Sequence, residues 1–254
     1  MNKIKLNGIE LAYERRGMGT PLALIHGYPL DHSIWNDVTD QLENDFDLII
    51  PDVRGFGEST TVDAPYSLSY IAYDLAALLD SLGVGPTALA GHSMGGYIAL
   101  AFAKSFPQRV TGLALVSSQA ASDTPERKEG RYKTAADVVQ KGVQIVADAM
   151  TDKLSPNQSV RDFVRPLIAK QSVAGVTGAL KAIAERDDMT SFIASYAQPL
   201  VLIHGDADEL IPLERAREIK SLVSSAQLVE LAGVGHMPML EMPNETASAL
   251  KKLK

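Results

Sequence analysis

Ser93 stands in the sequence Gly91-His92-Ser93-Met94-Gly95, where an apolar run at 87–91 passes into a helix-like run. A serine hydroxyl is a weak nucleophile at neutral pH, so a catalytic serine must be held at a sharp turn, beside a base and near hydrogen-bond donors. A GxSxG pattern between a strand and a helix presents its serine in this way, because the glycines remove Cβ atoms that would collide with neighbouring backbone. We therefore predict that Ser93 is a nucleophile rather than the serine of an ordinary structural turn.

A base and an acid follow Ser93 in the chain, each at the end of a later apolar run. Asp206 and Asp208 come directly after the run at 199–205, and His236 comes after the run at 226–233. The carboxyl ends of parallel strands meet at one edge of an α/β sheet, so three such ends would gather serine, acid and histidine. This set can activate the serine and orient its base.

The backbone after a fourth run, at 22–25, can supply an oxyanion hole. Gly27 allows close approach of the backbone, and we expect the N–H groups of Tyr28 and Met94 to point at a developing oxyanion. The Tyr28 ring could line an acyl pocket or anchor this loop, and the sequence leaves both open. Trp35 is expected to anchor the loop by burying its apolar surface, and His32 is expected at the pocket rim or in solvent.

Apolar runs of strand length alternate with helical periods along the chain. Runs that are apolar on both faces are typical of parallel strands covered by helices, whereas the first segment alternates around Asn7-Gly8 and predicts a hairpin. The class is therefore α/β. Residues 119–178 contain no convincing strand and show helix starts at Thr124-Pro125 and Ser155-Pro156. Residues 1–118 and 179–254 are expected to form the core domain, with 119–178 inserted as a helical cap.

A stripe of apolar residues inside the predicted cap has helical spacing. Its members are Val139, Val143, Val146 and Met150. Such a stripe usually packs into a core, and we expect core packing here in preference to contact with a substrate.

Composition narrows the classes of partner. The chain has 254 residues, a formal net charge of −7 and no cysteine. The acidic balance argues against nucleic acid and anionic membranes, and the lack of cysteine excludes disulfides and thiolate chemistry. No apolar run approaches a membrane span and no leader pattern is visible, so we expect a cytoplasmic protein that binds a small molecule. The sequence has no HExxH or close His/carboxylate set, so neither a metal nor a cofactor is expected.

Five segments together resemble the α/β-hydrolase fold superfamily: HGYP (26–29), DVRGFGEST (52–60), GHSMGG (91–96), HGDADELIP (204–212) and GHMPMLEMP (235–243). The resemblance covers nearly the whole chain and is nearest to small-cap carboxylesterases and 3-oxoadipate enol-lactonase-like proteins. It implies a mostly parallel sheet of about eight strands with helices on both faces. In the family pattern the acid falls on Asp208, with Pro212 closing the segment, which favours Asp208 over Asp206.

The resemblance also implies a reaction. We expect a serine hydrolase that cleaves small to medium esters or lactones through a Ser93-His236-Asp208 triad and an acyl-enzyme. The aspartate-nucleophile branches are disfavoured because position 93 is serine. Three alternatives remain open: a triad-bearing receptor for a small ligand with little turnover, a cofactor-free perhydrolase, and a carbon–carbon bond hydrolase.

Overall fold

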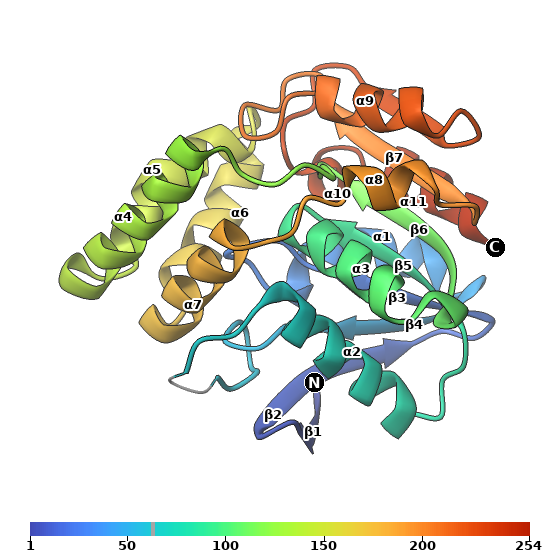
Figure 1. Cartoon of the computed structure of the whole chain (residues 1–254), viewed down its shortest axis with the longest axis horizontal. Coiled ribbons are helices and arrows are strands. Elements are labelled where there is room, and N and C mark those ends of the chain that lie inside the picture. Colours follow the sequence, from blue (N-terminus) through green and yellow to red (C-terminus); the bar gives the residue numbers. More distant parts are fainter. Residues whose placement is uncertain (62–63) are drawn as a thin grey trace.

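An eight-stranded sheet organises the chain in the computed structural model, which describes residues 1–61 and 64–254 (Figure 1). The strand order is β1-β2-β4-β3-β5-β6-β7-β8. Only the pairs β1–β2 and β2–β4 are antiparallel, so the predicted mostly parallel sheet of about eight strands is confirmed. The strands are β1 (Asn2–Leu6), β2 (Ile9–Arg16), β3 (Thr20–Ile25), β4 (Phe46–Pro51), β5 (Thr87–His92), β6 (Val110–Val116), β7 (Leu200–Gly205) and β8 (Gln227–Leu231).

The first two strands form the predicted hairpin at the sheet edge. Asn7 and Gly8 connect them with φ angles of 47° and 79°. A two-residue turn with positive φ at both positions matches the twist of the flanking strands, and asparagine followed by glycine adopts it readily. The Asn7-Gly8 signal thus identified the turn correctly.

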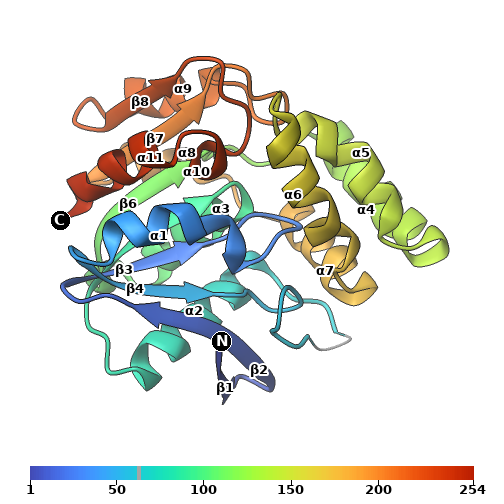
Figure 2. The same cartoon turned by 180° about the vertical axis from the view of Figure 1, so that it is seen from behind.

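The central strands are buried on both faces, as their continuous apolar runs require. Figure 1 shows α2 and α3 in front of the sheet, and Figure 2, from behind, shows α1 and α11 in front of it. These helices are α1 (Asn36–Leu42), α2 (Leu68–Ser81), α3 (Met94–Ser105) and α11 (Pro243–Leu250). The shorter elements are α8 (Thr190–Ala194), α9 (Glu214–Leu222), α10 (Pro238–Glu241), and the 3-10 turns η1 (His32–Trp35), η2 (Pro107–Arg109) and η3 (Lys251–Leu253).

Four helices between β6 and β7 form a group beside the sheet, with α4 packed on α7 and α5 on α6 (Figure 1). They are α4 (Pro125–Lys141), α5 (Gln144–Leu154), α6 (Gln158–Ala169) and α7 (Val173–Ala184). Thr124 caps α4 as predicted, since its side chain accepts a hydrogen bond from the N–H of Arg127. Helix α7 runs past residue 178, where we had predicted that the inserted helical segment ends.

The helix start predicted at Ser155-Pro156 is wrong. Ser155 lies in extended backbone after α5, and its hydroxyl accepts from the N–H of Asn157 at 3.0 Å. The carboxamide oxygen of Asn157 then accepts from the N–H of Ser159 at 3.0 Å and caps α6. Both Ser and Asn favour the N-cap, and here the residue two positions later has the capping geometry.

The apolar stripe predicted for the core is divided between two helices. Gly142 ends α4 at a φ of 83°, so Val139 lies on α4 whereas Val143 is the N-cap residue of α5. Val139 is 66% exposed, whereas Val146 and Met150 line a cavity. The prediction that this stripe packs into the core was therefore wrong for Val139, because the helical spacing does not continue across Gly142.

No helix in the described part of the chain combines the length and apolarity needed to cross a membrane.

Candidate active site

Ser93 lies at the turn between β5 and α3 with φ 51° and ψ −113°, a conformation that L-residues rarely adopt. Its N–H donates to the carbonyl of Val116 at 2.9 Å, and its carbonyl accepts from the hydroxyl of Ser118 at 2.8 Å. A Cβ on Gly91 would overlap the backbone of Gly95, which shows why the pattern needs glycine. Neighbouring strands thus hold the serine in the strained turn typical of an exposed nucleophile.

Asp208 and His236 are hydrogen-bonded to each other, with Nδ1 of His236 at 2.7 Å from Oδ2 of Asp208. The other oxygen, Oδ1, accepts from the N–H groups of Leu210 and Ile211 at 2.9 and 3.0 Å. An ionised carboxylate only accepts, so the Nδ1 of His236 carries the proton. Its Nε2 is left able to take a proton from another group.

The environment of Asp208 keeps its carboxyl group ionised. Burial alone would raise the pKa of Asp208, but the neighbouring His236, hydrogen bonds from His204 and His236, and the N–H of Ile211 together hold it well below its usual range. Asp208 is 8% exposed and His236 is 2% exposed. A buried, ionised carboxylate can therefore stabilise a histidine that becomes charged.

Asp206 has a different environment. Its carboxylate accepts from the N–H of Gly233 at 2.6 Å and so closes the loop after β8. The structure brings Asp208, and not Asp206, to His236. The aspartate favoured by the family pattern is therefore the one that contacts the histidine.

Ser93 and His236 both line a cavity of about 540 Å³. Tyr28, Met94 and Tyr97 line it as well, and a volume of this size fits a small-molecule ligand. Among the loop, turn and cap hydrogen bonds of the described residues, none uses the N–H of Tyr28 or Met94 as a donor. Met94 is the first residue of α3, where N–H groups lack an intrahelical partner and attract negative charge.

The side chain of Tyr28 is both buried and part of the cavity wall, which combines the two roles left open by the sequence. Trp35 is fully buried and does not belong to the cavity wall, as expected for a structural anchor.

His92 and His204 hold the backbone around the predicted acid and base. Nε2 of His92 donates to the carbonyl of His236 at 2.8 Å, and Nε2 of His204 donates to the carbonyl of Ile211 at 2.7 Å. Burial lowers the pKa of His92 well below its usual value, so its ring stays neutral. The sequence placed both histidines near strand ends but gave no sign of these contacts.

His26 joins the loops after β3 and β4. Its Nδ1 donates to the carbonyl of Gly27 at 2.9 Å, and its Nε2 accepts from the N–H of Val53 at 2.9 Å. Burial lowers the pKa of His26. This neutral ring braces the loop that carries Tyr28.

Two contacts hold the loop of His236 from outside the predicted triad. The N–H of His236 donates to the carbonyl of Leu154, the last residue of α5, at 2.8 Å. The carboxylate of Glu241 accepts from the N–H groups of Gly235 at 3.1 Å and Met237 at 3.2 Å. The sequence analysis did not single out Glu241, although it lies inside the GHMPMLEMP segment.

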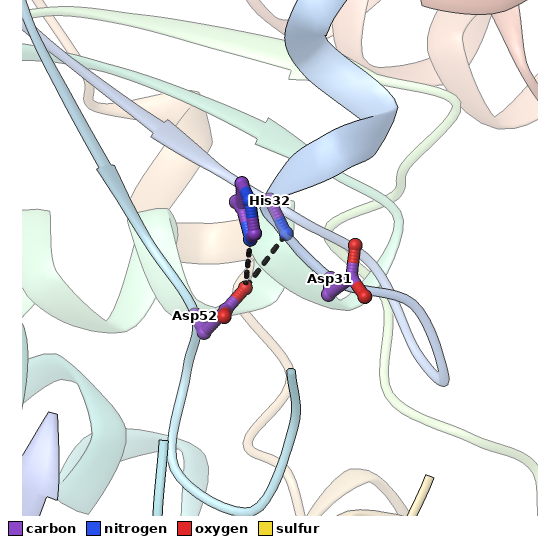
Figure 3. Close-up of side chains that lie close together, drawn as sticks. All are labelled: Asp31, His32 and Asp52. Atoms are coloured by element: carbon purple, nitrogen blue, oxygen red, sulfur yellow. Dashed lines mark hydrogen bonds and ion pairs between the residues drawn. The ribbon is translucent and has the colours of Figure 1, made fainter. Parts of the chain in front are cut away.

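His32 was predicted at the pocket rim or in solvent, but it does not line the cavity and its side chain is only 18% exposed. Its ring and backbone nitrogens both donate to Oδ1 of Asp52 at 2.8 Å (Figure 3). Asp31, His32 and Asp52 form a cluster close enough to resemble a metal site. However, Asp52 is also bonded by the N–H of Glu58, and Asp31 pairs with Lys170 at 2.7 Å. Hydrogen bonds and an ion pair thus account for its carboxylates, and this donor set does not fit a resident cation.

The loop after β4 contains another ion pair. Arg54 pairs with Asp74 of α2, at 2.6 Å from Nε, and both side chains are 1% exposed. Its guanidinium also lies over the ring of Tyr70, 4.5 Å from the centroid. Arg54 therefore joins this loop to α2 and takes no part in the cavity.

Comparisons with known proteins agree with the fold. A family model described as alpha/beta hydrolase fold matches residues 20–243. The chain is 28% identical to Lipase 1 of Psychrobacter immobilis, over 98% of this chain and 81% of that protein. A thermophilic esterase from Thermogutta terrifontis, solved with malate bound, is 33% identical, with a TM-score of 0.95 over 99% of this chain and 97% of that one. The enol-lactonase of Burkholderia xenovorans LB400 has the same fold at 23% identity, with a TM-score of 0.92 over 99% of each chain.

Proposed function

The chain belongs to the alpha/beta hydrolase fold family, and we propose that it is a serine hydrolase that cleaves carboxylic esters or lactones with small to medium acyl groups. The observation that carries the proposal is the 2.7 Å hydrogen bond between Asp208 and His236, at a cavity that Ser93 also lines. Similarity to a lipase and to an esterase supports ester bonds as the reacting group.

In the proposed reaction His236 removes the hydroxyl proton of Ser93 as the serine oxygen attacks the ester carbonyl. The Asp208 carboxylate holds the imidazole with its Nε2 free and stabilises the imidazolium that forms. The N–H groups of Tyr28 and Met94 donate to the oxyanion of the tetrahedral intermediate. The imidazolium then protonates the departing alcohol.

Water completes the cycle by the same route. His236 takes a proton from a water molecule as the water oxygen attacks the acyl carbon, and the imidazolium then returns the proton to the oxygen of Ser93 as the acid leaves. The strained backbone of Ser93 supports this assignment, since such a conformation persists where function requires it. None of these steps needs a metal or an organic cofactor.

We also propose that helices α4 to α7 act as a cap that shapes the substrate pocket. Residues of α4, α5 and α7 line the same cavity as Ser93, which supports this division into a core and an inserted cap. The sequence predicted the cap at 119–178, and we propose that it includes all of α7. A cavity of about 540 Å³ is compatible with short and medium acyl chains.

Steady-state hydrolysis of p-nitrophenyl acetate, butyrate, octanoate and palmitate tests the proposal. We expect sustained turnover that is fastest with the short chains. Ser93→Ala should lower kcat by a factor on the order of 10⁶. Ser81→Ala, at an exposed position on α2, is the matched control and should leave turnover unchanged.

Two outcomes would contradict the proposal. A single burst of product followed by a stall would favour a ligand receptor with little turnover. Hydrolysis by Ser93→Ala at the rate of the unmodified protein would remove Ser93 as the nucleophile.

A further inference from the structure

The charge of the cavity wall is opposite to that of the whole molecule. The chain has a formal net charge of −7, yet three cationic side chains, Arg127, Arg131 and Lys153, line the cavity against one carboxylate on the lining, Asp137. Asp137 is itself paired with Lys141 at 2.7 Å. A locally positive wall in an acidic protein attracts anions to that place, while the rest of the surface repels them.

These charges occupy one side of the cavity. Arg127, Arg131 and Asp137 belong to α4, and Lys153 belongs to α5. Ser93 and His236 enter from the strand ends of the sheet. The wall of the cavity also includes an apolar group, made up of Ile145, Val146, Met150, Leu180 and Ile183. A ligand with its ester at Ser93 would therefore meet both apolar surface and positive charge in this cavity.

The guanidinium of Arg131 is held in place by a carboxylate that it shares with a second guanidinium. It bonds to Asp123, and the same carboxylate pairs with Arg186 at 2.9 Å. One buried carboxylate thus serves two guanidinium groups, and the set keeps a net positive charge. Arg131 and Tyr28 both line the cavity, and the positive charge of Arg131 acts against the rise that burial causes in the pKa of the Tyr28 hydroxyl.

Neither of the other two cations has an anionic partner among the residues that the structure describes. Arg127 donates to the carbonyl of Leu210 at 2.9 Å, and no ion pair within the described ranges involves Arg127 or Lys153. The acidic residues of α5 instead form ion pairs with arginines of α6: Asp148 pairs with Arg165 and Asp152 with Arg161. Lys153 is therefore the charged residue of α5 that lines the cavity.

We propose that the preferred substrate carries a carboxylate at the end distal to the scissile carbonyl, as in a monoester of a dicarboxylic acid. This inference rests on the proposed ester hydrolysis and adds a substrate class to it. Lys153 and Arg127 attract the distal carboxylate to the cap side, with Arg131 adding fixed positive charge. The apolar residues of the wall accommodate the methylene chain between the carboxylate and the ester.

Matched pairs of esters isolate the effect of a terminal carboxylate on the rate of hydrolysis. Monoethyl adipate and ethyl hexanoate differ only in a terminal carboxylate or methyl group, as do monoethyl glutarate and ethyl pentanoate. Hydrolysis is followed by titration of the released acid near neutral pH, and the readout is the ratio of kcat/KM for the acidic ester to that for the neutral one. We expect a ratio above one for the unmodified protein, falling at an ionic strength of about 0.5 M because salt screens exposed charges.

Variants at Lys153 test whether this side chain attracts the distal carboxylate of the substrate. Lys153→Met should lower the ratio on the order of threefold and Lys153→Glu on the order of tenfold, mainly through KM, as expected for an exposed charge. Lys133→Met removes an exposed charge of α4 that does not line the cavity, and it should keep the ratio. The rate with ethyl hexanoate shows whether each variant is folded and competent.

The outcomes separate the two proposals. A ratio of one or less in the unmodified protein, or a ratio unchanged by Lys153→Glu, would overturn the anionic substrate class while leaving ester hydrolysis in place. If neither member of any pair is hydrolysed and the p-nitrophenyl esters are also inert, the proposed function itself fails.

Discussion

The backbone N–H of His236 donates to the carbonyl of Leu154 at 2.8 Å, which joins the loop of the proposed base to the last residue of α5. Gly235 makes this approach possible, because a Cβ there would lie 2.8 Å from Cδ of Pro156 and 3.0 Å from the oxygen of Leu154. The proposed cap and the base are therefore in direct contact. A shift of the α5 end would move the imidazole as well.

Gly235→Ala should separate these two segments. We expect a loss of stability of about 1 to 3 kcal/mol from overpacking and a fall in kcat on the order of tenfold or more, since small displacements of a catalytic group are costly. Gly233→Ala is the control: its φ of 73° makes alanine strained, but no atom lies within 4 Å of the added Cβ. Chemical unfolding and p-nitrophenyl butyrate kinetics measure both effects. Unchanged kcat in Gly235→Ala would show that the contact does not position the base.

Asp208→Asn should abolish most activity, although the asparagine side chain has nearly the same shape as that of aspartate. The amide oxygen would keep the two N–H groups of Leu210 and Ile211, so its NH₂ would face Nδ1 of His236. Nδ1 would then have to accept, and the proton would move to Nε2 and block the base. The expected loss in kcat is about 10⁴-fold. Asp206→Asn, whose oxygen can still accept from Gly233, should be nearly normal, and equal losses in the two variants would refute the assignment of the acid.

Glu241→Ala should loosen the loop of His236. It would leave the N–H groups of Gly235 and Met237 without their acceptor, at a cost of about 1 to 3 kcal/mol. We expect kcat to fall with little change in KM, and Glu241→Gln, which keeps an accepting oxygen, to recover most of the rate. Glu245→Ala, at an exposed position in the first turn of α11, is the control. If Glu241→Gln is as slow as Glu241→Ala, the negative charge matters rather than the hydrogen bonds.

The sequence predicted the features that depend on local geometry. The turn at Ser93 needs glycine on both sides, the hairpin needs residues that accept positive φ, and buried parallel strands need continuous apolar runs. Each requirement allows only a few residue types, and it does so at fixed positions along the sequence. The family pattern favoured Asp208 over Asp206, and Asp208 is the aspartate that His236 contacts, whereas the sequence predicted no strand order.

Contacts between distant segments could not be predicted in this way. The bond from His236 to Leu154 uses backbone atoms on both sides, so it leaves no signature in residue type. His32 and Asp52 meet because β3 and β4 are neighbours in the sheet, a pairing that their separation in sequence does not reveal. The misplaced start of α6 has a local cause, since Ser155 and Asn157 are both good caps and only the backbone decides between them.

The His32–Asp52 pair predicts a pH-dependent stability. Burial would lower the pKa of His32, but the hydrogen bond and charge of Asp52, with Asp31 and Glu14 nearby, outweigh it and raise the pKa above its usual value. A raised pKa in the folded state means that the stabilising charge is fully present below the unfolded pKa of about 6.5 and is lost as pH rises through the folded pKa. His32→Gln should therefore lower the free energy of unfolding more at about pH 5.5 than at about pH 8.5, and the difference should be about 1 kcal/mol.

Urea unfolding of both proteins at these two pH values measures the difference. Arg16→Gln is the control, because the ion pairs of Arg16 with Asp40 and Glu43 involve no histidine, and the loss of stability should be the same at both pH values. A cost for His32→Gln that is equal at both pH values would mean that a neutral hydrogen bond, rather than the imidazolium, holds the loop after β3 to Asp52. A larger cost at the higher pH would contradict the raised pKa itself.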